Sequence, residues 1–187
     1  MRRFNTHYLR QDRPHAFLSA SKYAWIRYSD DKLMQVYSDR MNAQKGTELH
    51  AVAKDLIKHK IKLPDNAKTM NRYVNDAIGF QLTPEQVLFV SENCYGTADA
   101  IGFRKNLLRI HDLKNGVTES SFDQLKVYAA MFCIEYRMKP FEIEIELRIY
   151  QNDEVRIEAG DPDEITHIMS KIFQFDKLIN EMNEEAL

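Results

Sequence analysis

Cysteine is scarce in this chain, and the two present, Cys94 and Cys133, lie far apart in the sequence. They form neither the close spacing of a metal site nor the framework of a disulfide-stabilised secreted domain, so we expect a reducing compartment. No run of about 18 apolar residues is present, which excludes a membrane-spanning helix. The N-terminus also lacks the apolar segment of a secretory signal. The sequence therefore predicts a cytoplasmic protein with no membrane partner.

Motor and repeat signatures are missing as well. The chain has no Gly-x-x-x-x-Gly-Lys-Ser/Thr loop, which holds the phosphates of ATP in motor proteins, and it has no internal repeat or low-complexity stretch. Its 187 residues, 44% of them hydrophobic, suffice for one domain with its own core. We expect a single domain over 1–187, with a helical part over 1–82 and a sheet with helices over 83–187.

Charge is distributed unevenly along the chain although the net charge is only −2. Residues 1–141 carry 22 Lys and Arg against 15 Asp and Glu, whereas residues 142–187 carry 4 against 13. A basic body with an acidic end can meet a polyanion with one face and repel it with the other. A solvated acidic helix face explains the same pattern, so the asymmetry permits a nucleic-acid partner without requiring one.

Hydrophobic periodicity predicts the secondary structure. Helical spacing is found in six segments: residues 18–28, 32–40, 46–60, 69–80, 121–138, and a last helix that begins at 161–164. Alternation typical of strands is found at 86–92, 96–103, 107–114, 142–150 and 155–158. Helices, a run of three strands, a helix and two further strands indicate an α/β fold, with a mixed central β-sheet flanked by helices.

Two aspartates and a lysine are expected to meet at one end of this sheet. Side chains alternate along a strand, so Asp112 and Lys114 share a face with the apolar residues Leu108 and Ile110. If the strands 96–103 and 107–114 form a hairpin, Asp99 lies beside them. Charged groups at the rim of an apolar face are costly unless they pair or bind a ligand.

Two converging carboxylates provide the oxygen ligands that Mg²⁺ prefers, with water and a substrate phosphate completing the shell. Such a cation would polarise a phosphoryl oxygen and acidify a bound water. Lys114 could orient that water or offset charge in the transition state. The alternative is that Lys114 is only the salt-bridge partner of one aspartate, and spacing alone leaves both interpretations open.

Asp99 followed by Asp112-Leu113-Lys114 resembles the core of the PD-(D/E)XK (restriction-endonuclease-like) nucleases, and further segments are similar to their RecB-like branch. Their order along the chain matches the order in that family. These segments are Leu18-Ser19-Ala20-Ser21, Gly46-Thr47-Glu48-Leu49-His50, Gly96-Thr97-Ala98-Asp99-Ala100, Gln124-Leu125-Lys126-Val127-Tyr128 and Ile149-Tyr150-Gln151.

The resemblance implies a stand-alone DNA nuclease that depends on Mg²⁺ or Mn²⁺. Asp99, Asp112, His50 and the backbone carbonyl of Leu113 would be metal ligands, and Lys114 would be the catalytic lysine. An imidazole ligand would shift the preference towards Mn²⁺.

Two residues on the helix after the catalytic strands complete the implied site. Gln124 and Tyr128 would support the phosphate, and as residues four apart on a helix they lie on one face. A glycine at position 46, one turn before His50, would permit a close approach of backbone. His111 points to the face opposite Asp112, so we leave it out of the site.

Relatives with an iron–sulfur cluster use four cysteines, so we expect no cluster here. By analogy we expect an exonuclease acting on single-stranded DNA or DNA ends, in recombination, repair or phage DNA processing, inside a bacterium or a phage-infected host. A strand-annealing or recombination partner and a homo-oligomer are compatible with that role. The rival interpretation is a catalytically silent nuclease fold that binds DNA or protein as an accessory subunit.

Two other groups of residues have two interpretations each. Tyr23, Trp25 and Tyr28, interleaved with Lys22 and Arg27, could stack on the bases of single-stranded DNA, or they could be ordinary amphipathic core aromatics. The glutamates of the segment 142–147 could form a second metal site, but their alternation with apolar residues favours a half-solvated strand.

Overall fold

The computed structural model describes residues 16–185, and the chain divides into two compact units, Met1–Lys45 and Gly46–Leu187. Each unit is described by itself. The expectation of one domain over 1–187 stays a prediction. Among the described residues, none of the helices combines the length and the apolar character that a membrane crossing requires.

The first unit contains the 3₁₀ helix η1, Ala20–Arg27, and the beginning of α1, Asp30–Lys58. Ser19 precedes η1 in an extended conformation but makes no side-chain capping bond; its hydroxyl lies 2.8 Å from that of Ser21. The indole N–H of Trp25 donates to the carbonyl of Ser19 at 3.0 Å.

Phe17, Trp25 and Tyr28 border a cavity of about 400 Å³, whereas Tyr23 does not line it and is exposed. Arg40 and Lys22 add positive charge to its lining, and Arg40 stacks over the ring of Phe17 at 5.6 Å. A cavity with rings and cations is compatible with both interpretations of the aromatic segment, so the base-stacking hypothesis stays open.

The two helices expected over 32–40 and 46–60 are one continuous helix, α1. The expected break between them was wrong, because no proline interrupts residues 41–45 and a single glycine, Gly46, is tolerated within a helix.

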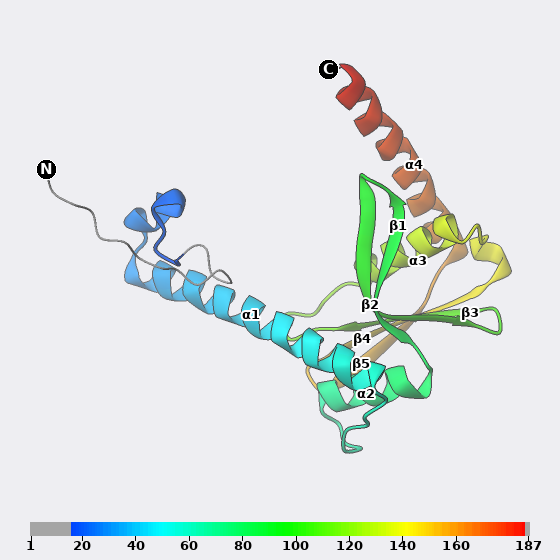
Figure 1. The fold of residues 1–187 in the computed structure, drawn as a ribbon, viewed down its shortest axis with the longest axis horizontal. Coiled ribbons are helices and arrows are strands. Elements are labelled where there is room, and N and C mark those ends of the chain that lie inside the picture. The colour runs from blue at the N-terminus through cyan, green and yellow to red at the C-terminus, as the bar shows by residue number, and fades with distance from the viewer. Residues whose placement is uncertain (1–15, 186–187) are drawn as a thin grey trace, which may run out of the picture. The chain divides into compact units, whose positions relative to one another are not determined.

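The second unit is built on a five-stranded mixed sheet in the order β1-β2-β3-β4-β5 (Figure 1). Only β3 and β4 run parallel, and all other neighbours are antiparallel. The mixed α/β architecture expected from the sequence is thereby confirmed. The strands are β1 Thr83–Ser91, β2 Cys94–Arg104, β3 Leu107–Leu113, β4 Glu144–Gln151 and β5 Glu154–Ala159.

Helices cover both faces of this sheet. The helix α3, Asp123–Glu135, and the first turns of α4, Pro162–Glu185, pack on one face over Leu108, Ile110 and Leu147. The helix α2, Thr69–Gly79, and the last turns of α1 pack on the other face over Ala100, Leu113 and Tyr150. The short 3₁₀ helix η2, Pro140–Glu142, leads into β4.

The parallel pairing of β3 with β4 determines where the site lies. A parallel pair needs a long crossover, and α3 supplies it between the end of β3 and the start of β4. The C-terminal end of β3, which carries Asp112, therefore lies close to the first turn of α3. Backbone pairing continues to this end, since the N–H of Lys114 donates to the carbonyl of Tyr150 at 2.9 Å.

Replacing Ile110 by alanine tests the packing of the central strand. Ile110 is 1% exposed under α3, so Ile110→Ala should lower the free energy of unfolding by about 2–5 kcal/mol, measured by urea denaturation followed by circular dichroism. Val117→Ala, at a position 87% exposed, should change it by less than about 0.5 kcal/mol. Equal effects of the two substitutions would contradict the placement of β3 at the core.

Candidate metal centre

Asp99 and Asp112 lie on adjacent strands at the same end of the sheet. Ala100 on β2 pairs with His111 on β3, so Asp99 and Asp112 occupy the next position along each strand. The Asp99 carboxylate accepts a hydrogen bond from the backbone N–H of Leu113 at 2.9 Å through Oδ2. A side-chain oxygen thus continues the pairing of the two strands at this point.

His50 reaches Asp99 from α1. Its Nδ1 lies 3.2 Å from Oδ1 of Asp99, so the two oxygens of this carboxylate face different partners. The ion pair with Asp99 raises the pKa of His50 above its usual value, although burial acts in the opposite direction. The imidazole is half-buried and remains close to water.

Gly46 allows α1 to approach the end of β3. A Cβ atom at this position would lie 3.0–3.3 Å from the side chain of Asn115, which is tighter than an ordinary contact. His50 is one helical turn further along, so the same close packing brings its ring to Asp99. This is the physical reason for a glycine four residues before the histidine.

Lys114 and the helix α3 form a chain of polar contacts beside Asp112. The ammonium group of Lys114 lies 3.0 Å from Asp112 Oδ2 and donates to Gln124 Oε1 at 2.9 Å. The Gln124 amide donates in turn to the hydroxyl of Tyr128 at 3.3 Å, and that hydroxyl donates to the carbonyl of Thr97 at 2.7 Å. The expected position of Gln124 and Tyr128 on one helix face is confirmed.

Gly96 makes room for this chain. A Cβ atom there would lie 3.1 Å from the ring of Tyr128, so a larger residue would push the tyrosine away from β2. Gly46 and Gly96, two glycines of the family-like segments, therefore leave the space in which Asn115 and Tyr128 pack.

The environment of Asp112 raises the pKa of its carboxyl group in the absence of a cation. The side chain is 3% exposed, and burial together with the nearby Asp99 carboxylate raises its pKa to about 6, although Lys114 acts to lower it. Among the described residues, the Lys114 ammonium is the one partner of its buried Oδ2 atom. The carboxylate therefore has room for a further positive partner.

His111 lies on the opposite face, as the alternation of side chains predicts. Its Nδ1 lies 3.1 Å from the hydroxyl of Tyr150, which donates to Asp76 at 2.7 Å. Burial lowers its pKa well below the usual value, and Arg148 and Arg109 act in the same direction. This network joins α2 to the sheet, and among the described residues the hydrogen bonds and ion pairs that hold it together do not include Asp99 or Asp112.

The strand interpretation of the glutamates at 142–147 agrees with the structure. Ile143, Ile145 and Leu147 are buried, and Glu146 pairs with Arg109 and Arg148 at 2.9 Å each. In the described part of the chain, the group that could hold a metal ion does not include these glutamates.

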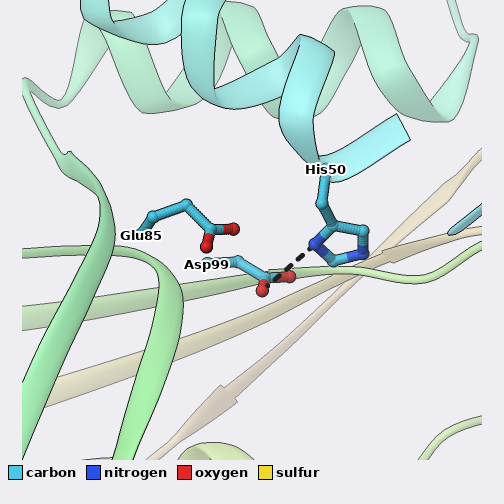
Figure 2. A group of neighbouring side chains, drawn as sticks. All are labelled: His50, Glu85 and Asp99. Atoms are coloured by element: carbon cyan, nitrogen blue, oxygen red, sulfur yellow. Dashed lines mark ion pairs between the residues drawn. The ribbon is translucent and has the colours of Figure 1, made fainter. Parts of the chain in front are cut away.

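Glu85 on β1 is the site residue that the sequence did not reveal. Ligand atoms of His50, Glu85 and Asp99 all lie within 4.8 Å of one another, and Figure 2 shows the three side chains converging from α1, β1 and β2. Asp112, the other expected side-chain ligand, is not in this group. The predicted strand began at Gln86, so only the pairing of β1 with β2 could have placed Glu85 beside Asp99.

Comparisons with known proteins add little. No family model and no curated protein matches the chain. The chain is similar to the solved structure entitled "Crystal structure of SSO0001". The match covers 82% of this chain and 68% of that one, with 15% sequence identity and a TM-score of 0.38. A likeness at this level does not bear on the activity.

The raised pKa of Asp112 predicts how the metal-free protein responds to pH. The folded state holds this proton more tightly than the unfolded chain, whose aspartates titrate near 3.9. The stabilisation is full below about pH 4 and is lost as the pH rises through about 6. Between pH 4 and 7, wild type should lose about 2 kcal/mol of unfolding free energy relative to Asp112→Asn, measured with EDTA present.

Asp65→Asn, in an exposed loop, is the matched control and should follow the wild-type curve. Parallel curves for wild type and Asp112→Asn would show that Asp112 does not carry the raised pKa.

Proposed function

We propose that this chain is a metal-dependent DNA nuclease with a PD-(D/E)XK core of the RecB-like type. The observation that carries the proposal is that Asp99 and Asp112 lie opposite one another on adjacent strands, with the ammonium group of Lys114 3.0 Å from Asp112. Binding alone does not call for a buried carboxylate, whereas hydrolysis of a phosphodiester uses carboxylates to hold a divalent cation beside an amine.

The residues at this end of the sheet fit a divalent cation. Asp99, Asp112 and the carbonyl of Leu113 offer hard oxygen ligands, and His50 adds a nitrogen, a set suited to Mn²⁺ or Mg²⁺. The fit rests on the buried Asp112 oxygen, for which Lys114 is the one partner among the described residues. A bound cation would supply charge to the phosphoryl oxygens and lower the pKa of a water molecule.

Lys114 is the residue that we assign to the reacting groups. Its ammonium can donate to the attacking water or to a phosphate oxygen while Asp112 and Gln124 fix its direction. Tyr128 anchors Gln124 and is itself held by β2, so the amine is positioned before substrate arrives. Gln124 and Tyr128 also offer polar groups to a phosphate.

We assign DNA as the substrate, and exonuclease action on single strands or ends, by analogy with the nuclease family that the chain's sequence segments resemble. Recombination, repair or phage DNA processing would use such an enzyme. A strand-annealing partner or a second copy of the chain would then be its companion.

Removal of the amine tests the catalytic assignment. Lys114→Ala should reduce DNA cleavage with Mg²⁺ or Mn²⁺ by about 100-fold or more, because a positioned donor to the transition state contributes about 10²–10³ in rate. Lys139→Ala is the control, since Lys139 is exposed and pairs only with Glu142 within the described chain. End-labelled linear DNA and closed circular DNA, single- and double-stranded, should be compared.

Linear substrates should be degraded and circles left intact. Cleavage of circles would refute exonuclease action, and equal rates for Lys114→Ala and wild type would refute the role of the amine.

Calcium separates the enzyme from the catalytically silent alternative. Ca²⁺ should support binding of DNA without turnover, and that binding should weaken steeply with salt, as measured by fluorescence anisotropy between 50 and 200 mM NaCl. Binding that is indifferent to Ca²⁺, with no turnover in Mn²⁺, would favour the accessory subunit.

A further inference from the structure

Glu85 has a backbone conformation that is unusual for a residue within a strand. Its φ is 51°, in the left-handed region that disfavours residues with a Cβ atom. Seven other non-glycine residues in the described chain share a positive φ, and all seven lie in turns between helices or strands. Glu85 is the one that lies within a strand.

This conformation accompanies a pair of like charges. Pro84 pairs with Ala100 and Gln86 with Ala98, so Glu85 occupies the position across from Asp99. Like charges directly opposite one another destabilise a pair of strands. Lys114 offsets the charge of Asp112 on β3, but no lysine or arginine among the described residues forms an ion pair with Glu85.

Two carboxylates and an imidazole that converge on one point are the arrangement of a cation site. Ligand atoms that share a cation at about 2.0–2.2 Å lie no more than about 4.4 Å apart. The ligand atoms of His50, Glu85 and Asp99 already lie within 4.8 Å, so small side-chain rotations suffice (Figure 2). All three are partly exposed, which leaves a path for the ion.

We propose that Glu85 is a ligand of a divalent cation, which it binds together with His50 and Asp99. This inference rests on the proposed function, because Asp99 then serves both this position and the one formed with Asp112 and the Leu113 carbonyl. A cation between the carboxylates removes their repulsion. It also accounts for a left-handed residue within a strand, since strained backbone persists where function requires it. The mixed oxygen and nitrogen ligands favour Mn²⁺ over Mg²⁺.

Binding of Mn²⁺ to the full chain, measured by isothermal titration calorimetry and by thermal unfolding, tests this assignment. Glu85→Gln keeps the size of the side chain and removes its charge. It should weaken Mn²⁺ binding at least 10-fold, and it should melt at or above the wild-type temperature in EDTA because the repulsion with Asp99 is gone. With saturating Mn²⁺, the melting temperature of Glu85→Gln should lie below that of wild type, because the variant gains less stability from the bound ion.

Glu85→Gly, which suits a positive φ, should show the same loss of Mn²⁺ affinity with a larger gain of metal-free stability. Glu92→Gln, in the exposed turn between β1 and β2, is the matched control and should bind Mn²⁺ as wild type does. Mn²⁺ affinity of Glu85→Gln within twofold of wild type would overturn the assignment.

A parallel titration of Asp112→Asn separates this inference from the proposed function. Loss of affinity in Asp112→Asn with none in Glu85→Gln would reject Glu85 and leave the proposed centre standing. No Mn²⁺ binding to the wild-type chain would reject both.

Discussion

The carboxylate of Asp99 is the group on which this structure depends at its functional end. One oxygen accepts the N–H of Leu113 and ties β2 to β3, while the other faces His50 and ties the sheet to α1. Glu85 on β1 approaches the same carboxylate. The side chain of Asp99 thus joins α1 and β3 to β2, and ligand atoms of His50 and Glu85 lie within 4.8 Å of it.

Stability and function oppose each other at this point. A buried Asp112 with a raised pKa, two carboxylates across a strand pair and a left-handed glutamate all cost folding free energy at neutral pH. On the opposite face of the sheet, His111, Tyr150 and Asp76 form a connected network, although the buried Nε2 of His111 has no hydrogen-bond partner among the described residues. A cation bound at the aspartate end would offset the negative charges of Asp112 and of the Asp99–Glu85 pair.

Most of the fold was predictable because periodicity is strong in this chain. The alternation in β2 and β3 was enough to place Asp112 and Lys114 on one face and His111 on the other, and a hairpin then brought in Asp99. His50 is predictable as a site residue only because the segment Gly46–His50 resembles a family motif. Helix periodicity does not indicate which other element a helix packs against. Glu85 could not be found at all, because its position depends on the register of β1 against β2 and on a φ that no residue pattern indicates. The prediction of two helices in place of the continuous α1 was wrong because a glycine at position 46 is typical of a helix boundary.

The central claim is that Asp99 and Asp112 hold a common divalent cation beside Lys114. Crystals grown with Mn²⁺ and measured at the manganese absorption edge would test it most directly, since anomalous scattering locates the ion without reference to activity. The account predicts a peak about 2.0–2.6 Å from oxygens of both carboxylates. An ordered crystal soaked in millimolar Mn²⁺ with no peak between these two side chains would contradict it.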